Sequence, residues 1–275
     1  MEWFKLKTII ILILLALNLC LLVLVYLREE NTSQYAEDIR DDAVSVLQNN
    51  GISLTARLPE DTQALSVYTV TRSTQDELAF ATALLGEGTT AENLGGGLYR
   101  YTGSRGSAQI SAGGSFACQF SALPSSFNGV TELCNFLTSL GYQTEVSADV
   151  PVNGSVTVSQ LWNKAPLISS ECVFTYSDSV LQSASGLLLT SAPVSADSTE
   201  ETSLSAATLL IRFLSGMIES GYVCNTVTDI TPSFQLSSIQ SDRITLTPVW
   251  LITTDTGNYN LNTITGELSQ EKSVS

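Results

Sequence analysis

The sequence contains no histidine among its 275 residues. This absence removes the side chain that most often serves as a general base and most often binds transition metals. The sequence also has no Cys-x-x-Cys pair, so neither a zinc site nor a thioredoxin-like motif is indicated. We therefore predict that the protein is not an enzyme and that it holds no metal or cofactor.

Positive charge is also scarce. The chain has 12 lysines and arginines against 27 aspartates and glutamates, which gives a net charge of −15. The phosphates of a nucleic acid would be repelled by such a protein, and docking of its folded part on anionic lipid is disfavoured. Hydrophobic residues make up 44% of the sequence, which is enough to bury a core. The composition indicates a folded protein with no role in nucleic-acid binding.

Five cysteines are present: Cys20, Cys118, Cys134, Cys172 and Cys224. Cys20 lies within a long apolar run, and the other four could form two disulfides in three possible pairings. Cys118 shares an alternating strand face with two phenylalanines, and Cys134 falls on the apolar stripe of an expected helix. These patterns favour buried free thiols, with disulfides as the alternative.

Residues 9–27 form an uncharged stretch of 19 residues, of which 15 are isoleucine, leucine or valine. As a helix it would be about 28 Å long, the thickness of a bilayer core. Its aliphatic residues favour insertion by about 7 kcal/mol, and Trp3 and Tyr26 stand where interfacial aromatic residues usually lie. The stretch is long for a signal peptide and lacks a small-residue cleavage site at its end. We predict a transmembrane helix.

The charges that flank this helix predict its orientation. Lys5 and Lys7 precede it, whereas Arg28 follows it next to two glutamates, which favours a cytoplasmic N-terminus. Residues 1–8 would then be a cytoplasmic tail, and the chain beyond residue 27 would lie outside the cell. Within the helix Asn18 is the clearly polar residue. Its amide would either hydrogen-bond a neighbouring helix or bond its own backbone.

Beyond the anchor the sequence predicts alternating helices and strands. Apolar spacing indicates helices in four places, and three of them end at a glycine followed by an apolar residue, at Gly51, Gly141 and Gly221. The four expected helices lie in the region 31–50, over 76–85, near 130–140 and over 207–218. The expected strands include 98–101, 116–120, 244–253 and 258–262, and strand-like segments run from 155–162 through 172–176 and on to 189. Residues 191–201 read as a surface loop.

The last two of these helices are each followed by strands that carry one tryptophan, at Trp162 and Trp250. A diverged tandem repeat is therefore a hypothesis, which different strand orders in residues 128–190 and 205–268 would exclude. The predicted fold class is α+β, with one N-terminal transmembrane helix followed by extracytoplasmic antiparallel sheets and packed helices. The predicted domains are a juxtamembrane helix at 28–50, a first α+β unit at 51–150 and a second at 151–275.

No catalytic motif is found in the sequence. Without histidine a serine or cysteine nucleophile would need a lysine as its base, and Lys164 is better explained as a hairpin turn residue. Asp255, Asn258, Asn260 and Glu267 have spacing that fails the EF-hand pattern, and this stretch also reads as a hairpin. A pair of carboxylates for glycoside hydrolysis stays open, because such a pair is formed in space and leaves no sequence motif.

Both ends of the chain resemble the YycI family. The resemblance rests on Glu2-Trp3, Lys7-Thr8 and Leu17-Asn18-Leu19 at the start, and on Thr247-Pro248-Val249-Trp250 through Tyr259, Asn262 and Thr265-Gly266-Glu267 at the end. Gln160-Leu161-Trp162 with Pro166 is a weaker similarity, and the resemblance does not extend to about residues 55–150. The resemblance implies an accessory regulator that works with a YycH-like protein on a membrane histidine kinase of cell-wall metabolism in Gram-positive bacteria, the YycG or WalK type.

By this resemblance the partner-binding residues are Asn18 and the surrounding helix face with Leu14, Leu17 and Leu21. Localisation in the cell membrane follows, single-pass, with an extracytoplasmic C-terminal domain. Two further functions stay open: an extracytoplasmic cell-wall-binding or structural protein without a signalling role, and a carboxylate-based hydrolase. An exposed apolar patch would favour the regulator, a long aromatic groove the cell-wall binder, and a cleft with two carboxylates about 5–10 Å apart the hydrolase.

Overall fold

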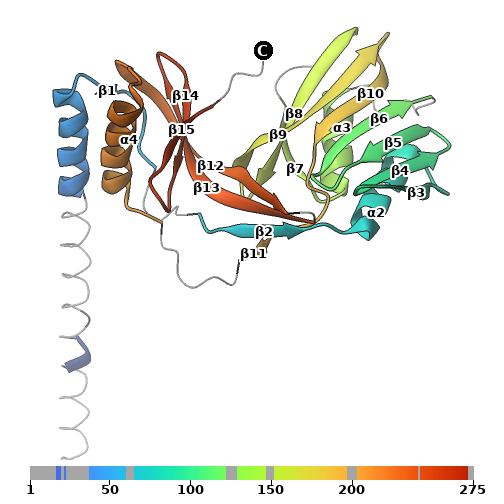
Figure 1. The fold of residues 1–275 in the computed structure, drawn as a ribbon, viewed down its shortest axis with the longest axis horizontal. Helices are drawn as coiled ribbons and strands as arrows, with labels where there is room; N and C mark the ends of the chain where they lie inside the picture. Colours follow the sequence, from blue (N-terminus) through green and yellow to red (C-terminus); the bar gives the residue numbers. More distant parts are fainter. Residues whose placement is uncertain are drawn as a thin grey trace, which may run out of the picture.

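The computed structural model describes residues 17–19, 22, 37–59, 65–121, 129–146, 152–196, 203–240 and 242–271. Over these residues the protein is α+β, with few helices and a large, mainly antiparallel sheet (Figure 1). The α+β class and the antiparallel character that the sequence predicts are confirmed.

Three segments share one order of elements: a helix, then four strands that each pair antiparallel with the next. The first consists of α2 (Thr74–Leu85), β3 (Thr90–Gly95), β4 (Leu98–Gly103), β5 (Gly106–Ile110) and β6 (Ser115–Phe120). The second consists of α3 (Val130–Ser139), β7 (Gln143–Val146), β8 (Gly154–Trp162), β9 (Ala165–Ser177) and β10 (Val180–Leu187). The third consists of α4 (Ala206–Ser220), β12 (Thr226–Gln240), β13 (Arg243–Thr254), β14 (Asn258–Asn262) and β15 (Leu268–Gln270).

The second and third segments correspond to the two stretches of the expected repeat, and their strand orders agree, so the repeat stays a hypothesis that the strand order does not exclude. The first segment is a further instance of the same order that the sequence analysis does not identify. Its strands have six residues or fewer and are separated by tight turns, so their alternation is too short to stand out. The division of the outer part into units at 51–150 and 151–275 stays a prediction.

The first two segments join into one sheet with the strand order β3-β4-β5-β6-β10-β9-β8-β7. Both α2 and α3 pack on it, because Leu84 and Leu85 of α2 and Leu133 and Leu137 of α3 belong to a single hydrophobic cluster with the strands. Phe80 of α2 meets Tyr142 edge to face, with ring centroids 5.8 Å apart. This packing makes the two segments one body with a common core.

The third segment forms the other end of the molecule, together with the helix of residues 37–49 (Figure 1). Ala43 and Leu47 of that helix are buried in the same cluster as Phe213 and Met217 of α4. Three short strands complete this end: β1 (Ser53–Leu54) pairs parallel with β12, β2 (Tyr68–Thr71) pairs antiparallel with β13, and β11 (Val194–Ser195) pairs antiparallel with β2.

Strand β9 belongs to both ends of the molecule. Its residues Leu167 and Ile168 pair parallel with Phe234 and Gln235 of β12, and residues 172–177 pair antiparallel with β10. Strand β8 pairs antiparallel with β9 on both sides of this point, at residues 165–166 and 171–176. Between the two parts Ser169 has a φ of 65°, a left-handed conformation that is uncommon for a residue with a side chain. The strand therefore changes its pairing partners at this point and links the two sheets.

The three predicted helix ends are confirmed, because Gly51, Gly141 and Gly221 have φ values of 83°, 87° and 69°. After α4 the amide of Tyr222 donates to the carbonyl of Met217, which satisfies a carbonyl that the end of the helix leaves free. The same α4 begins at Ser205, whose side chain accepts from the amide of Thr208. Local sequence signals therefore set the ends of these helices.

The predicted hairpin turns also hold. Asn163 and Lys164 both have positive φ, at 51° and 67°, and connect β8 to β9. The strand-like stretch that the sequence predicts through 172–176 and on to 189 is two paired strands, because Asp178 and Ser179 turn the chain with φ values of 52° and 61°. The predicted loop 191–201 needs a correction as well: Ser191 is buried and β11 forms within it. The two residues of β11 are held by their pairing with β2, and the local sequence does not indicate this pairing.

The predicted transmembrane stretch, residues 9–27, lies outside the described residues except for 17–19 and 22. Among the residues that are described, no helix has both the length and the apolarity needed to cross a bilayer. The transmembrane helix, the tail at 1–8 and residues 28–36 of the juxtamembrane helix therefore stay predictions, whereas 37–49 are helical as expected.

Gly186 tests how tightly β9 and β10 are paired. It has a φ of 144°, and a Cβ at this position would collide with the backbone of Glu171 and Cys172. Gly186→Ala should therefore lower the free energy of unfolding by about 3 kcal/mol, through backbone strain and a displaced strand. Gly221→Ala is the matched control. It also has positive φ but open space around it, and should cost about 1 kcal/mol. Equal losses of unfolding free energy for the two variants, measured by urea denaturation, would contradict this account.

Candidate functional site at the sheet junction

Four of the eight buried polar side chains of the described residues, Glu77, Gln160, Ser170 and Ser191, lie where the two ends of the molecule meet. Strand β2 ends there, and the next residue, Arg72, leads towards α2. The amide of Arg72 donates to the carbonyl of Asp242, in the turn between β12 and β13, at 2.7 Å. On the other side the segment 188–191 leaves β10. Backbone from both ends of the molecule therefore meets at this junction.

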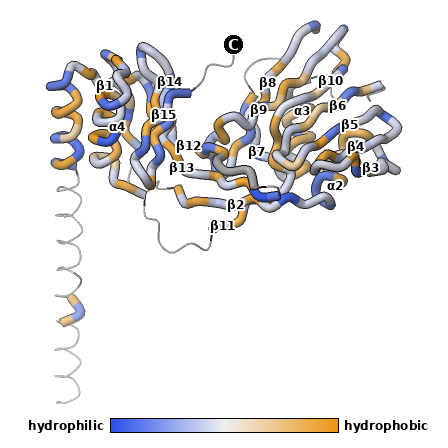
Figure 2. Tube along the Cα trace, in the orientation of Figure 1, coloured by the Kyte–Doolittle hydropathy of each residue, from blue (hydrophilic) through white to orange (hydrophobic). Residues whose placement is uncertain are grey.

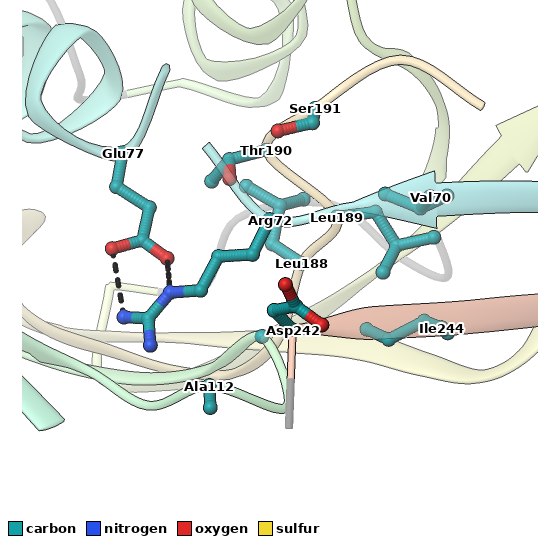
Figure 3. A pocket seen from close by; sticks show the side chains of 11 residues that line it. Val70, Arg72, Glu77, Ala112, Leu188, Leu189, Thr190, Ser191, Asp242 and Ile244 are labelled. Atoms are coloured by element: carbon teal, nitrogen blue, oxygen red, sulfur yellow. Dashed lines mark hydrogen bonds and ion pairs between the residues drawn. The ribbon is translucent and has the colours of Figure 1, made fainter. Parts of the chain in front are cut away.

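Arg72 forms a two-point ion pair with Glu77, in the first turns of α2 (Figure 3). Its Nε donates to Oε1 at 2.5 Å and its Nη2 donates to Oε2 at 2.9 Å. The hydroxyl of Tyr101, from β4, also donates to Oε2, at 2.8 Å. The carboxylate thus accepts three hydrogen bonds, from two different parts of the chain.

The guanidinium makes two more contacts. Its Nη1 donates to the carbonyl of Gly97 at 2.6 Å, and its carbon lies 5.2 Å from the centre of the Tyr99 ring, in a cation–π arrangement. The side chains of Arg72 and Glu77 are 11% and 2% exposed. Because a buried ion pair needs further hydrogen bonds to offset its desolvation, these contacts explain why the pair can lie inside the protein.

The titration behaviour of the cluster opposes proton-transfer chemistry. The hydrogen bond to Glu77 is the main cause that raises the pKa of Arg72, so the guanidinium keeps its charge. Burial, and then the hydrogen bond to Glu77, raise the pKa of Tyr101 far above its ordinary value. Neither group can exchange a proton readily near neutral pH. A general acid or base needs a pKa near the working pH, so neither Arg72 nor Tyr101 is suited to that role.

The hollow beside the cluster is also too small for a substrate. It lies between Arg72, Asp242 and the segment 188–191 (Figure 3) and has room for about 20 Å³. That volume holds about one water molecule. We conclude that the Arg72–Glu77–Tyr101 cluster, referred to below as the clamp, fixes the two ends of the molecule against each other.

A second buried network lies close to the clamp, around Gln160 of β8. Its Nε2 donates to the carbonyl of Leu189 at 3.1 Å, and its Oε1 accepts from the amide of Leu189 at 3.0 Å. The hydroxyl of Ser170 donates to the same Oε1 at 3.2 Å. The side chain of Gln160 therefore replaces a strand partner for the chain that leaves β10, next to the point where β9 changes partners.

Of the residues singled out in the sequence, few lie near this junction. Leu17 and Asn18 lie in a short helical stretch and are exposed, whereas Trp3, Leu14, Leu21 and Tyr26 lie outside the described residues. The side-chain amide of Asn225 and then the backbone amides of Asn225 and Thr226 donate to Asp255, which lowers the pKa of its carboxyl. The expected hairpin is present as the pairing of β13 with β14. In the described stretches no three histidine, cysteine, aspartate or glutamate side chains stand close enough to bind a metal.

The four described cysteines are free thiols, and Cys118, Cys172 and Cys224 are buried. The structure thus has the free-thiol alternative rather than two disulfides. Sequence reasoning did not identify Arg72, Glu77 or Tyr101. The sequence signal for these residues is weak. Glu77 occupies an early helix position, where an acidic residue is common on a solvated face. Its partner Tyr101 lies 24 residues downstream in β4, and its partner Arg72 lies in the linker before the helix.

No family profile and no curated protein matches the sequence. Among solved structures, an uncharacterised protein from Eubacterium rectale is similar, with 10% identity and a TM-score of 0.47, over 81% of this chain and 91% of that one. The YpeB C-terminal domain of Bacillus megaterium is similar with 11% identity and a TM-score of 0.36, over 74% of this chain and 99% of that domain. These likenesses are weak. YpeB is a different family from YycI, so the YycI resemblance stays an expectation.

The clamp predicts a large loss of stability when one partner is removed. Glu77→Gln leaves the buried guanidinium without its counter-charge and should lower the free energy of unfolding by about 3–5 kcal/mol in urea denaturation. Glu92→Gln is the matched control, because Glu92 pairs with Arg100 at 3.6 Å on the surface and should change stability by less than about 1 kcal/mol. In the double variant Arg72→Met with Glu77→Gln, most of the loss should be recovered. Additive losses would show that the two side chains do not act as a pair.

The buried thiols predict that the fold weakens in alkali. Burial raises the pKa of both Cys118 and Cys172 from 9.0 to about 12. Because the folded-state values are raised, the stability that these thiols contribute is fully present below pH 9 and is lost as the pH rises towards 12. At pH 10.5 each thiol should cost about 2 kcal/mol relative to pH 8. Replacing both by alanine should lower stability at pH 8 but flatten its decline with pH; an unchanged slope would contradict the assignment.

Proposed function

We propose that the protein is a membrane-anchored accessory regulator that acts through protein contacts rather than chemistry. Its partners would be a YycH-like protein and a membrane histidine kinase, as the YycI resemblance implies. The observation that supports protein contact is apolar surface on the helix pair formed by residues 37–49 and α4. Nine large apolar side chains are exposed in the described residues beyond position 22, and five of them lie on this pair or directly after α4: Ile39, Val46, Ile211, Ile218 and Val223.

The exposed apolar side chains of each helix lie on one face of that helix. Ile211 and Ile218 are seven residues apart on α4, as are Ile39 and Val46 on the helix of residues 37–49, so each pair lies on one helix face. Ile218 is 65% exposed and Val223 is 72% exposed. Figure 2 shows apolar segments on both helices at this end of the molecule. Exposed apolar surface of this kind favours a protein partner.

The helix pair also follows the predicted anchor in sequence. Residues 37–49 begin ten positions after the apolar stretch ends at Leu27. A contact made by the helix pair and a contact made by Asn18 within the bilayer could therefore engage one single-pass partner together. Two linked contacts bind more tightly than either alone, because the second forms at a high effective concentration.

The test is affinity capture of the full-length protein from its native membranes, with the captured proteins identified by mass spectrometry. A membrane histidine kinase should be captured. Asn18→Leu should weaken the capture about 3- to 30-fold, the equivalent of one interhelical hydrogen bond of about 0.6–2 kcal/mol. Ile218→Glu should weaken it as well, because it places a charge in the apolar stripe.

Val152→Glu is the matched control for Ile218→Glu, since Val152 is 62% exposed but belongs to the other end of the molecule. It should leave capture unchanged. Failure of the wild-type protein to capture any histidine kinase would exclude the proposal. Capture that survives Asn18→Leu but not Ile218→Glu would place the contact on the outer part and exclude a role for the anchor helix.

A further inference from the structure

The first two segments of the molecule meet at a seam between their fourth strands. Strand β6, the fourth of the first segment, pairs antiparallel with β10, the fourth of the second, over residues 115–119 and 183–187. Both strands are therefore paired on two sides, because β6 also pairs with β5 and β10 also pairs with β9. The two segments bury one common core beside these strands. One helix-and-meander segment thus associates with another through the outer edge of its fourth strand.

The fourth strand of the third segment, β15, has no such neighbour among the described residues. It pairs with β14 alone, in regular register over residues 259–261 and 268–270. Just after β15 the amide of Glu271 donates to the carbonyl of Asn258, so the backbone of Glu271 points towards β14. Because backbone groups along a strand point to its two sides in turn, those of Leu268 and Gln270 point to the open side.

The open edge is held in place by the rest of the third segment. Helix α4 lies so close to β15 that a Cβ added at Gly216 would come within 2.6 Å of the Cβ of Leu268. The side chain of Leu268 packs against the hydrophobic cluster below α4. A strand that is ordered before binding loses little conformational entropy when another strand is added to it.

We propose that β15 pairs antiparallel with β15 of a second copy of this chain. The third segments of the two copies would then form a seam of the kind that β6 and β10 form within one copy. In the described residues the fourth strands of the first two segments are already paired on both sides, so the third segment of a second copy is the matching partner. Such a contact is two-fold and closes, because each β15 satisfies the other. The inference does not depend on the proposed regulatory function.

The charges beside β15 select the register of this pairing. Pairing centred on Ser269 would place Glu267 of each copy opposite Glu271 of the other, and like charges directly opposite are destabilising. Pairing centred on Gln270 places Ser269 opposite Glu271 instead. The two Gln270 residues should therefore lie opposite each other, with Cα atoms about 5.5 Å apart.

The first test is disulfide cross-linking of the full-length protein in membranes. Cys20 and Cys134 are first replaced by alanine, because the other three cysteines are buried. Gln270→Cys should then give about fivefold more linked dimer than Glu92→Cys, because it brings two Cα atoms within the range of a disulfide. Glu92 is the matched control, since it is exposed on an edge strand too, but on β3, a first strand whose pairing is irregular. Equal yields of linked dimer would overturn the proposal.

The second test measures energy transfer between donor- and acceptor-labelled full-length copies in the same lipid vesicles. Gln270→Pro removes the N–H on the open side and leaves the bonds between β15 and β14 intact. It should lower the transfer to the level found with an excess of unlabelled wild-type protein. Gln270→Ala is the matched control, because it keeps the N–H, and should leave the transfer unchanged.

Two results of the second test would overturn the proposal: no transfer for the wild-type protein, or transfer that Gln270→Pro leaves intact. The latter result would place the contact between copies elsewhere, for example in the predicted anchor helix. If Gln270→Pro does not fold, as judged by circular dichroism, the cross-linking yields of Gln270→Cys and Glu92→Cys decide the question.

Discussion

The ion pair between Arg72 and Glu77 is the constraint on which the arrangement of the two ends of the molecule depends. Arg72 follows the last residue of β2, and its amide is bonded to the turn between β12 and β13, so its backbone belongs to one end. Its side chain reaches Glu77 in α2 and Gly97 beside β4, which belong to the other. A buried guanidinium is tolerated only when its donors are matched, so any shift between the two ends would leave a charge without partners.

Around this constraint one simple unit is used three times. A helix followed by a four-stranded meander cannot bury the apolar face of its sheet without cover. In the first two segments the cover is shared, because α2 and α3 lie on one continuous sheet and have one core. In the third it comes from α4 and from the helix of residues 37–49. The same local order thus gives a paired body at one end and a single unit with an added helix at the other.

The parts of this fold that could be predicted are those with local causes. Helix ends at Gly51, Gly141 and Gly221 follow from a backbone conformation that glycine adopts without strain, and the Asn163–Lys164 turn follows from its position between two alternating stretches. Strand orders in the second and third segments agree with the expected repeat, because long strands show their alternation clearly. The turn at Asp178 and Ser179 was not placed, because these residues adopt positive φ without a glycine to signal it.

The clamp and the network around Gln160 could not be predicted, for a different reason. Glu77 meets Tyr101 across 24 residues, and Gln160 meets Leu189 across 29, so each pair exists only after the sheets have formed. A glutamate in the first turns of a helix and a glutamine in a strand are ordinary residues until their partners are known. Local sequence does not show which ordinary side chains will lie together in the folded protein. Both sites at the junction consist of such side chains.

The strand shared by the two ends, β9, has a mechanical consequence. It pairs with β12 at residues 167–168, with β10 at 172–177 and with β8 on both sides of that change, so tension applied at the helix pair passes along one continuous backbone into the far sheet. Neither end can detach without exposing an unpaired edge of this strand, which ties the opening of one to the opening of the other. The molecule should consequently melt as one cooperative body, although its topology is that of three consecutive units.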